Sequence, residues 1–327
     1  MSLTALQTYL RPLEKLFAEE GIQEISINKP GEAWVEKFGD MRYEALPEFT
    51  LEHLQSLAHL VAQSTSQSIS SEKPLLSATL PEGYRIQIVF PPAVEGKSIA
   101  MSIRKQATLQ LTLDDYERMG AFDRTITGVV PEHPGDRELK ELYARGDVKQ
   151  FIIRAVQHKK NIIISGGTST GKTTFLNAAL RALDPQERII TVEDAREVRL
   201  ENVPNRVHLL ASKGGQGLAK VTTQDLIEAC LRLRPDRIIV GELRGAEAFS
   251  YLRAVNTGHP GSIASLHADS PQLAIEQLIL MIMQADLGVT RDQIKAYVES
   301  VVQVVIQLKR GEKGVRYISE IYYKPGY

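Results

Sequence analysis

Apolar residues near the start of the chain recur at the spacing of an amphipathic helix. The pattern covers residues 1–20 and uses the positions Leu3, Leu6, Leu10, Leu13 and Phe17. A spacing of three to four residues places these side chains on one face of a helix, and Pro12 is expected to interrupt that helix because proline donates no helical hydrogen bond. We expect the apolar face to pack on its own domain; docking on a partner or on a membrane surface is the alternative.

Short strand-like segments, separated by turns, follow this helix. We expect strands at 24–28, 33–37, 41–45, 85–90 and 98–104, with a helix at 51–64. Their alternation predicts an α+β domain over residues 1–128. The next segment, 129–147, is rich in proline, glycine and charge, so it is expected to be a linker that carries a short helix.

The pattern changes at Val148, where short, wholly apolar strands begin to alternate with helices. We expect helices at 148–158, 173–183, 223–233 and 246–255, and strands at 161–165, 188–192, 207–211, 237–240 and 261–266. Strands without a polar face are typical of a parallel sheet that is covered on both sides. The chain is therefore predicted to be an α/β protein, in which the linker leads to a second domain, 148–327, with a mostly parallel sheet.

Composition and charge restrict the classes of function. The 327 residues include 39 Lys and Arg against 40 Asp and Glu, which gives a net charge of −1, and 6% of the residues are aromatic. Such a chain has no strong positive field to attract nucleic acid and few rings to stack on bases, so direct nucleic-acid binding is not expected. Its one cysteine, Cys230, excludes an intrachain disulfide and a cysteine zinc cluster, and its place in an apolar helical pattern predicts burial.

No apolar run in the sequence reaches the length of about 18 residues that a membrane helix needs. The longest runs, at 278–283 and 301–306, are far shorter. Charged residues interrupt the N-terminal segment, so it is not expected to be a secretory signal. We expect a cytoplasmic protein whose association with a membrane is at most peripheral.

A glycine-rich segment has the spacing of a P-loop, or Walker A, motif. It reads Gly166-Gly167-Thr168-Ser169-Thr170-Gly171-Lys172-Thr173-Thr174 and lies between an expected strand and an expected helix. Glycines allow backbone N–H groups to point at phosphate, and the N-terminus of the helix adds its dipole. Lys172 is expected to bind the β- and γ-phosphates, and the Thr173 hydroxyl to join the shell of a Mg²⁺ ion. The motif therefore predicts a site for a nucleoside triphosphate with Mg²⁺.

Polar residues end three of the expected apolar strands. These residues, Glu193, Glu242 and His267, are expected to meet beside the phosphate loop, because the carboxyl ends of parallel strands share one edge of a sheet. Gly241 stands where a common second nucleotide motif has aspartate, so Glu242 is expected to hold the metal and Glu193 to act as general base. His267 is expected to sense the γ-phosphate or to bridge to the carboxylates. A transition-metal site shared with His259 is not expected, because no third ligand is evident.

Four segments, taken in order, resemble the traffic ATPases of type II and type IV secretion, most closely the branch that powers conjugation and effector secretion. They are the phosphate loop, the acidic segment Ile189–Asp194, the segment Leu231–Arg244 and the histidine segment Thr257–Ala268. The resemblance implies a RecA-like fold for the P-loop domain and hydrolysis of ATP with Mg²⁺. Other branches often carry a four-cysteine zinc module, so the single cysteine favours the type IV branch.

The same resemblance extends to the N-terminal domain. The segments Gly83–Ile86 and Ile99–Lys105 are similar to two strands that, in this family, present arginines to the nucleotide. Arg85 and Arg104 are therefore expected to face the phosphates and to stabilise transition-state charge; solvated strand arginines are the alternative. The resemblance also implies a homohexameric ring, with the nucleotide held between the two domains of each subunit.

The function expected from these observations is Mg²⁺-dependent ATP hydrolysis that drives a hexameric motor of a type IV secretion or conjugation system. Such a motor is expected at the cytoplasmic face of the inner membrane, bound to inner-membrane proteins of the secretion complex. Arg232 and Arg234 are candidates for contacts between its subunits or for a helix-end salt bridge. Two other functions stay open: a nucleotide-gated scaffold with little turnover, and a nucleic-acid motor with a similar core.

Overall fold

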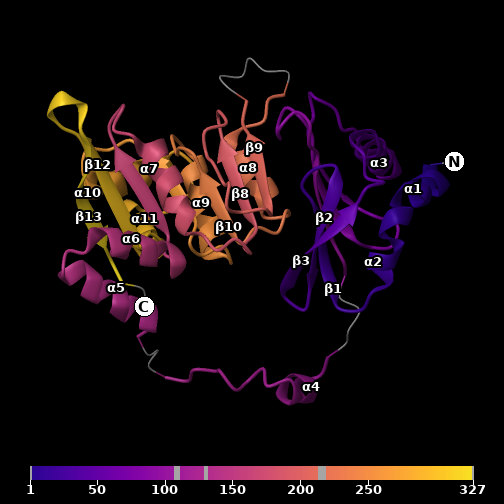
Figure 1. The fold of residues 1–327 in the computed structure, drawn as a ribbon, viewed down its shortest axis with the longest axis horizontal. Helices are drawn as coiled ribbons and strands as arrows, with labels where there is room; N and C mark the ends of the chain where they lie inside the picture. The colour runs from indigo at the N-terminus through magenta and orange to yellow at the C-terminus, as the bar shows by residue number, and fades with distance from the viewer. Residues whose placement is uncertain (1, 107–110, 129–131, 213–218, 326–327) are drawn as a thin grey trace.

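The chain folds into two domains, each built on its own β-sheet (Figure 1). The computed structural model describes residues 2–106, 111–128, 132–212 and 219–325. Within these ranges, no helix combines the length and the apolar character needed to cross a membrane. The domains lie side by side along the long axis of the molecule.

The N-terminal domain contains an antiparallel sheet of six strands within the described residues, in the order β3-β2-β1-β6-β5-β4. The strands are β1 (Ile22–Ile27), β2 (Gly31–Lys37), β3 (Asp40–Leu46), β4 (Leu75–Thr79), β5 (Arg85–Val89) and β6 (Ala100–Arg104). The helices are α1 (Ser2–Leu10), the 3-10 turn η1 (Arg11–Leu13), α2 (Glu14–Ala18) and α3 (Leu51–Ser64). Pro12 lies in η1, so the expected N-terminal helix is interrupted where proline predicted.

The apolar face of the first helices packs on the N-terminal domain itself. Leu6, Leu10 and Leu13 are buried with Leu54 and Leu57 of α3 in one hydrophobic cluster. This packing confirms the expectation that the amphipathic N-terminal segment serves its own domain.

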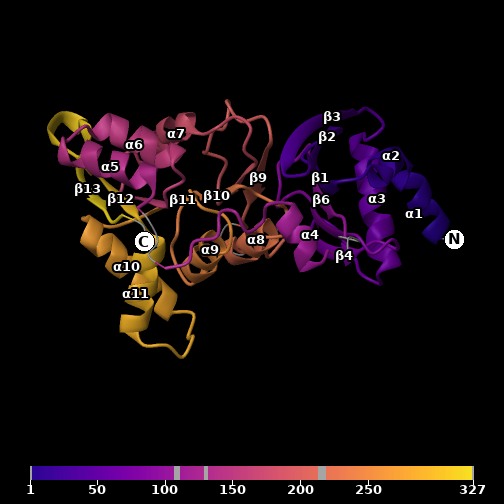
Figure 2. The ribbon, with the colours of Figure 1, turned by 90° about the horizontal axis from the view of Figure 1, so that it is seen from below.

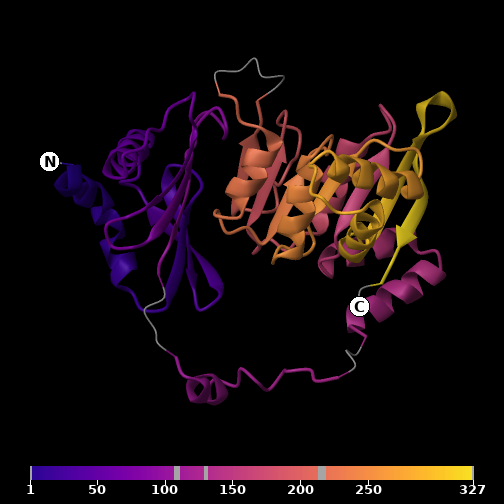
Figure 3. The same ribbon diagram turned by 180° about the vertical axis from the view of Figure 1, so that it is seen from behind.

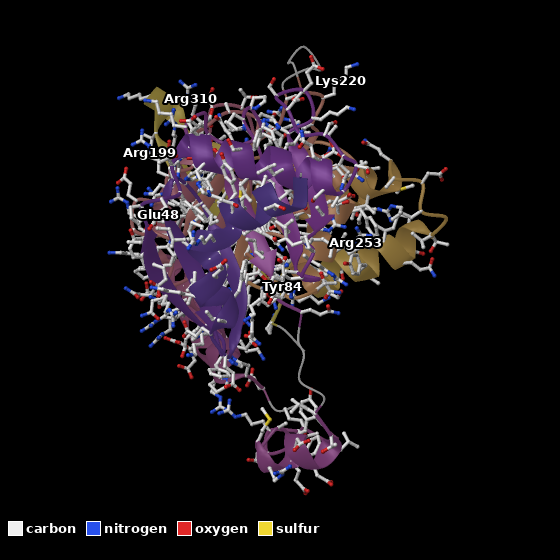
Figure 4. All side chains as sticks on the ribbon, turned by 90° about the vertical axis from the view of Figure 1, so that its right-hand side faces the viewer. Glu48, Tyr84, Arg199, Lys220, Arg253 and Arg310 are labelled. Atoms are coloured by element: carbon white, nitrogen blue, oxygen red, sulfur yellow. The ribbon has the colours of Figure 1, made fainter. Side chains whose placement is uncertain are left out.

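The described part of the connection between the domains, residues 111–128, lies apart from both (Figures 1 and 4). It contains one short helix, α4 (Leu113–Arg118). We expected the linker at 129–147, of which residues 129–131 lie outside the described ranges. Most of that segment instead forms α5 (Pro134–Ala144), whose leucines Leu139 and Leu142 are buried in the core of the C-terminal domain. The described part of the connection, residues 111–128, therefore precedes the segment 129–147, whose composition predicted a linker.

The C-terminal domain, in its described residues, is a seven-stranded sheet in the order β13-β12-β7-β11-β10-β8-β9. The strands are β7 (Ile162–Gly166), β8 (Ile189–Glu193), β9 (Arg206–Leu210), β10 (Arg237–Val240), β11 (Ile263–Leu266), β12 (Val304–Arg310) and β13 (Arg316–Tyr323). The strands from β12 to β9 run parallel, and β13 pairs antiparallel with β12 through the turn η4 (Glu312–Gly314). This mostly parallel sheet confirms the predicted α/β fold.

Helices cover both faces of this sheet (Figure 2). One face carries α5, α6 (Val148–Gln157) and α7 (Lys172–Ala179) with its extension η2 (Leu180–Ala182); the other carries α8 (Thr223–Cys230), α9 (Glu247–Asn256), α10 (Pro271–Met283) and α11 (Arg291–Val301). Successive strand residues point into opposite clusters: Ile162 and Ile164 of β7 belong to one and Ile163 to the other. Cys230 is buried in the second cluster, as predicted.

The N-terminal domain packs against the β9 edge of the C-terminal sheet, which Figure 3 shows from behind. Val94, in the loop between β5 and β6, forms a β-bridge with Leu209 of β9. The Leu210 N–H donates to Ala93 O at 2.9 Å, which extends this contact by one residue. The loop thus continues the C-terminal sheet into the other domain.

A buried arginine fixes the same contact from the C-terminal side. Arg188, immediately before β8, donates to the Oδ1 atoms of Asn28 and Asn205, both at 2.6 Å, and to Leu233 O at 2.9 Å. Asn28 belongs to the N-terminal domain and itself donates to Asn205 at 3.0 Å. We term the contact made by Ala93, Val94, Asn28, Arg188, Asn205, Leu209 and Leu210 the domain seam.

Candidate active site

Glycines shape the phosphate loop at its two ends. Gly166 ends β7, and a Cβ atom at this position would lie 2.6 Å from Thr170 Oγ1 and 2.9 Å from Leu308 O, so a larger residue does not fit. Gly171 has a φ of 88° and caps α7, a left-handed conformation that favours glycine. Strand, loop and helix follow one another as the motif predicts, so the N-terminus of α7 opens on the loop, where its dipole favours an anion.

Lys172 is folded back onto the loop. Its Nζ donates to Gly166 O at 2.9 Å and to Gly167 O at 3.3 Å, and it lies 3.2 Å from His267 Nδ1. Burial lowers the pKa of this lysine, against the opposing effect of the Glu242 carboxylate. Neutral carbonyl oxygens are weaker partners for an ammonium group than a phosphate oxygen is, so a phosphate that enters the loop can draw Lys172 away from them.

A cavity of about 730 Å³ lies between the phosphate loop and the ends of three strands, a size typical of a small-molecule site. Most of the residues expected at the site line it: Thr168, Ser169, Thr170, Gly171, Lys172, Thr173, Thr174, Glu193, Glu242 and His267. Gly166 and Gly167 begin the same loop. The residues meet because β7, β11, β10 and β8 are neighbours that run in one direction, so their carboxyl ends share an edge of the sheet.

Glu193 ends β8 and is held on both carboxylate oxygens. Thr191 Oγ1 donates to Oε1 at 2.8 Å, and the backbone N–H groups of Glu197 and Val198 donate to Oε2 at 2.7 Å each. Burial raises the pKa of this carboxyl, but the neighbouring His208 imidazole and the hydrogen bonds from Val198, Glu197 and Thr191 outweigh burial and bring the pKa below its ordinary value. Glu193 is therefore ionised at neutral pH and fixed in place.

Glu242 follows β10 and lines the same cavity. Its Oε2 accepts from Arg244 Nη2 at 2.8 Å, and its Oε1 lies 2.8 Å from His267 Nε2. Gly241, before it, faces Glu193: a Cβ atom at 241 would lie 3.5 Å from Glu193 Cγ. An aspartate at 241 would add a second carboxylate beside Glu193, and like charges that close disfavour ionisation of both. Glycine at 241 therefore leaves the acidic role to Glu242.

His267 follows β11 and connects the lysine to the second carboxylate. Its Nε2 faces Glu242, while its Nδ1 faces the Lys172 ammonium group, which can only donate. The hydrogen-bond pattern thus assigns the proton to Nε2. Of the two expected roles, this geometry matches the bridge between lysine and carboxylate.

The residues expected to hold Mg²⁺ line the same cavity. Thr173 Oγ1 donates to Glu197 Oε2 at 3.1 Å, and Glu242 is among the other lining residues. A hydroxyl and one or two carboxylates beside bound phosphates fit Mg²⁺, which keeps several water ligands. His259 faces elsewhere, with its Nδ1 at 2.9 Å from Pro235 O. Within the described ranges, no cluster of three or more His, Cys, Asp or Glu side chains is placed to chelate a metal.

Arg85 and Arg104 do not lie at the phosphate loop of their own chain. They pair opposite each other on β5 and β6, and they line a separate cavity of about 400 Å³ that includes Arg232 and Arg234. The separation follows from topology: the N-terminal domain sits at the β9 edge, and β8, β10 and β11 stand between that edge and β7.

One of the candidate interface arginines has a partner within the chain. Arg234 Nε donates to Glu36 Oε2 at 2.9 Å, and its Nη1 donates to Asp236 Oδ1 at 2.6 Å. Because Glu36 belongs to β2, this salt bridge joins the two domains instead of closing a helix end. Arg232 lines the cavity beside it with an exposed side chain.

Two arginines that line the phosphate cavity were not expected from the sequence. Arg316 reaches it from β13, and its Cδ would lie 2.8 Å from a Cβ atom at Gly171. Arg244 pairs with Glu242 and with Asp194. Arg316 is distant in sequence from every nucleotide motif, so no local pattern marked it. Arg244 lies within the Leu231–Arg244 segment, but an arginine in a loop has no distinctive spacing.

Comparison with known proteins places this geometry in a family. The model of the type II/IV secretion system protein family matches residues 7–316. The chain is 39% identical to the type IV secretion system protein VirB11 of Bartonella henselae, over 97% of this chain and 92% of that protein. It is 37% identical to the type IV secretion system protein PtlH of Bordetella pertussis, over 97% and 95%. The crystal structure of the VirB11 ATPase from the Brucella suis type IV secretion system, in complex with sulphate, matches with a TM-score of 0.92 and 37% identity over 98% of each chain.

Proposed function

This chain belongs to the type II/IV secretion system protein family, in its type IV branch, and from that premise we propose that it is a hexameric cytoplasmic motor that hydrolyses ATP with Mg²⁺ at the inner face of the inner membrane. The family resemblance, the RecA-like α/β fold and the ATPase class expected from the sequence are thereby confirmed. The proposal for the motor rests on the cavity in which Lys172, Glu193, Glu242 and His267 meet. Hydrolysis drives assembly of the secretion complex or translocation of its substrate.

Nucleotide binding rearranges the partners of the phosphate loop. Lys172 leaves the carbonyl groups of Gly166 and Gly167 and binds the β- and γ-phosphates. Thr173 and Glu242 would hold Mg²⁺, which would supply positive charge beside the phosphates. When Lys172 moves, His267 Nδ1 loses a donor, so the histidine and Glu242 register the presence of the γ-phosphate.

Glu193 is the proposed general base. Its carboxylate is charged at neutral pH, is fixed by Thr191 and by two backbone N–H groups, and lines the phosphate cavity. A fixed carboxylate can orient the attacking water in line with the γ-phosphate and accept its proton as the bond to phosphorus forms.

Arg85 and Arg104 are proposed to act on the phosphate loop of a neighbouring subunit in the ring. This assignment is supported by their distance from their own loop in the sheet order, and by the described linker segment, which packs on neither domain of its own chain. An arginine supplied from another subunit would stabilise transition-state charge, a contribution of about 10³–10⁵ in rate in other phosphoryl-transfer enzymes.

The first experiment measures phosphate release from Mg-ATP by the wild type, Lys172→Ala and Glu193→Gln, each fractionated by size. We expect activity in a ring-sized fraction of the wild type and its loss by about 100-fold or more in both variants. A monomer that is equally active would contradict the ring mechanism, and a Glu193→Gln protein that keeps its rate would move the base to another residue. If the wild type binds nucleotide but releases phosphate no faster than Lys172→Ala, the alternative function, a nucleotide-gated scaffold with little turnover, would be favoured.

A mixing experiment tests the placement of the arginines. Lys172→Ala and Arg104→Ala proteins are inactive alone in this proposal, because each lacks one part of every site. Mixed rings contain sites that combine an intact loop from one subunit with an intact arginine from its neighbour, so phosphate release should reappear on mixing. Mixtures that stay inactive, although mass measurement shows that mixed rings form, would assign the arginines to their own subunit.

A further inference from the structure

A second histidine lies behind the catalytic carboxylate, outside the phosphate cavity. His208 is on β9, paired in register with Thr191 of β8, so both side chains project from the same face of the sheet. His208 is buried, with 3% of its surface exposed, and its Nδ1 lies 3.7 Å from Glu193 Oε1. His208 was not expected to have a role, because a histidine inside an apolar strand has no motif around it.

The hydrogen bonds around His208 define which ring nitrogen carries the proton. The Thr191 hydroxyl donates its single hydrogen to Glu193 Oε1, so at 2.8 Å it must accept from His208 Nδ1. On the other side, Arg196 Nη2 lies 2.7 Å from His208 Nε2, and a guanidinium group can only donate. His208 is therefore the neutral tautomer with its proton on Nδ1. Burial lowers the pKa of this imidazole, which agrees with a neutral ring.

The chain of contacts continues into the N-terminal domain. Arg196 Nε donates to Glu95 Oε1 at 2.7 Å, and Glu95 follows Val94, the residue that bridges to β9 at the domain seam. A series of hydrogen bonds of 2.7–2.8 Å thus connects Glu95 to Glu193. It passes through the side chains of Arg196, His208 and Thr191.

We propose that His208 is a positioning residue for Glu193, acting through the Thr191 hydroxyl, and that Glu95 and Arg196 make this positioning depend on docking of the N-terminal domain. The proposal rests on the proposed role of Glu193 as general base. His208 does not line the phosphate cavity, so we expect its loss to leave nucleotide binding unchanged. Its effect falls on the orientation of the base, which matters in the chemical step. Loss of the imidazole should therefore lower kcat and leave KM for ATP unchanged.

The test compares His208→Leu with His208→Gln in the full-length protein. Leucine can neither donate nor accept, whereas the glutamine amide can donate to Thr191 and accept from Arg196. We expect His208→Leu to lower kcat by about 10-fold to 100-fold, the usual cost of removing a group that orients a working side chain, with KM within about twofold of the wild type. His208→Gln should recover most of the rate. Equal losses in both variants would overturn the proposal.

The hydrogen bonds that connect His208 to Glu193 can also be interrupted at Thr191, without changing the buried histidine. Thr191→Val removes the hydroxyl at nearly constant volume, and Thr191→Ser keeps it. We expect Thr191→Val to reproduce the kcat loss of His208→Leu and Thr191→Ser to stay near the wild type, which keeps the proposal testable if His208→Leu does not fold. A Thr191→Val protein with the wild-type kcat would contradict the proposal that His208 acts on Glu193 through the Thr191 hydroxyl.

A double-mutant comparison separates this inference from the proposed function. If His208 acts through Glu193, His208→Leu should cost nothing further in a Glu193→Gln background. A full rate for Glu193→Gln alone would overturn the base assignment and this inference with it. A lost rate for Glu193→Gln beside an unchanged rate for His208→Leu would overturn this inference only, as would equal losses from His208→Leu in both backgrounds.

The link to the N-terminal domain has its own variant and control. Glu95→Gln removes the charge that holds Arg196, and we expect a loss of kcat of about threefold, smaller than for His208→Leu because the pair is half-exposed. Glu82→Gln changes an exposed carboxylate before β5 and should have no effect. If Glu95→Gln and Glu82→Gln behave alike, docking of the domain does not control the base.

Discussion

The phosphate cavity and the domain seam are each organised around a cation, but the two cations are held in opposite ways. In the cavity, Lys172 donates to loop carbonyls that a phosphate can replace, and Arg316 reaches over Gly171 from an exposed hairpin. In the seam, Arg188 is fully buried and donates to two asparagine oxygens and to Leu233 O. A cation that stays accessible can bind a ligand, whereas a cation enclosed by preplaced acceptors fixes one arrangement of the domains.

Burial has a measurable effect on the seam cation. It lowers the pKa of Arg188 to about 10, partly offset by the Glu24 carboxylate nearby. The guanidinium group is still charged at neutral pH, and its amide and carbonyl acceptors compensate part of the hydration that it loses, because Nη2 has no hydrogen-bond partner among the described residues. The seam should therefore contribute to stability, and the cavity to binding.

The largest expected effect follows removal of the seam cation. Arg188→Met leaves Asn28 Oδ1 buried without its donor and leaves Asn205 Oδ1 with Asn28 as its remaining donor, so the free energy of unfolding should fall by about 2–4 kcal/mol. Denaturant unfolding measures this change, and the affinity of the folded fraction for nucleotide should be unchanged. Arg199→Met, at an exposed arginine labelled in Figure 4, is the control and should shift stability by less than about 0.5 kcal/mol. If Arg188→Met and Arg199→Met lower the free energy of unfolding equally, the buried arginine of the domain seam contributes no more to stability than an exposed one.

A smaller effect, on binding instead of stability, is expected from Arg316→Ala. The exposed guanidinium group can reach a bound phosphate across Gly171, and its loss should raise the dissociation constant of a non-hydrolysable ATP analogue about fivefold, or about 1 kcal/mol. Arg310→Ala is the matched control, because Arg310 pairs opposite Arg316 on the same hairpin and does not line the cavity. If both variants bind the ATP analogue more weakly, the hairpin as a whole affects nucleotide binding and Arg316 has no specific role.

The smallest expected effect concerns pH at the border between the two regions. His208 faces Arg196, Glu193 and Glu95, and its pKa in the folded protein lies below 6.5. A histidine with a depressed pKa contributes stability that is present above its unfolded pKa and is lost as pH falls through the folded value. Below pH 6.5, the free energy of unfolding should therefore decline more steeply for the wild type than for His208→Gln. If the free energy of unfolding depends on pH in the same way in both proteins, the pKa of His208 is not lowered in the folded state.

Much of the site was predictable because its signals are local. The phosphate loop, Glu193, Glu242 and His267 each stand at the end of a short apolar strand, and parallel neighbours bring such ends together. The helix at 51–64 was predicted with the bounds that α3 has, since its apolar period and its Thr50 cap agree.

The remaining features depend on contacts between distant segments. Arg316 belongs to a hairpin, and nothing in its sequence indicates that β12 pairs beside the phosphate strand β7. The edge of the sheet that receives the N-terminal domain is likewise set by Asn28, Arg188 and Asn205, three polar residues in three separate segments. For the same reason, the sequence could not show that Arg85 and Arg104 would lie away from their own loop.

Strand β8 joins the two regions, since Arg188 immediately precedes it and Glu193 ends it. Five residues of extended backbone measure about 17 Å, and a strand hydrogen-bonded on both sides is stiff along its axis. A displacement of one end of β8 along the strand axis is therefore expected to move the other end as well. With Glu193 in its proposed role as general base, a displacement of about 1 Å at this end of the strand would lower the rate of hydrolysis by about 100-fold.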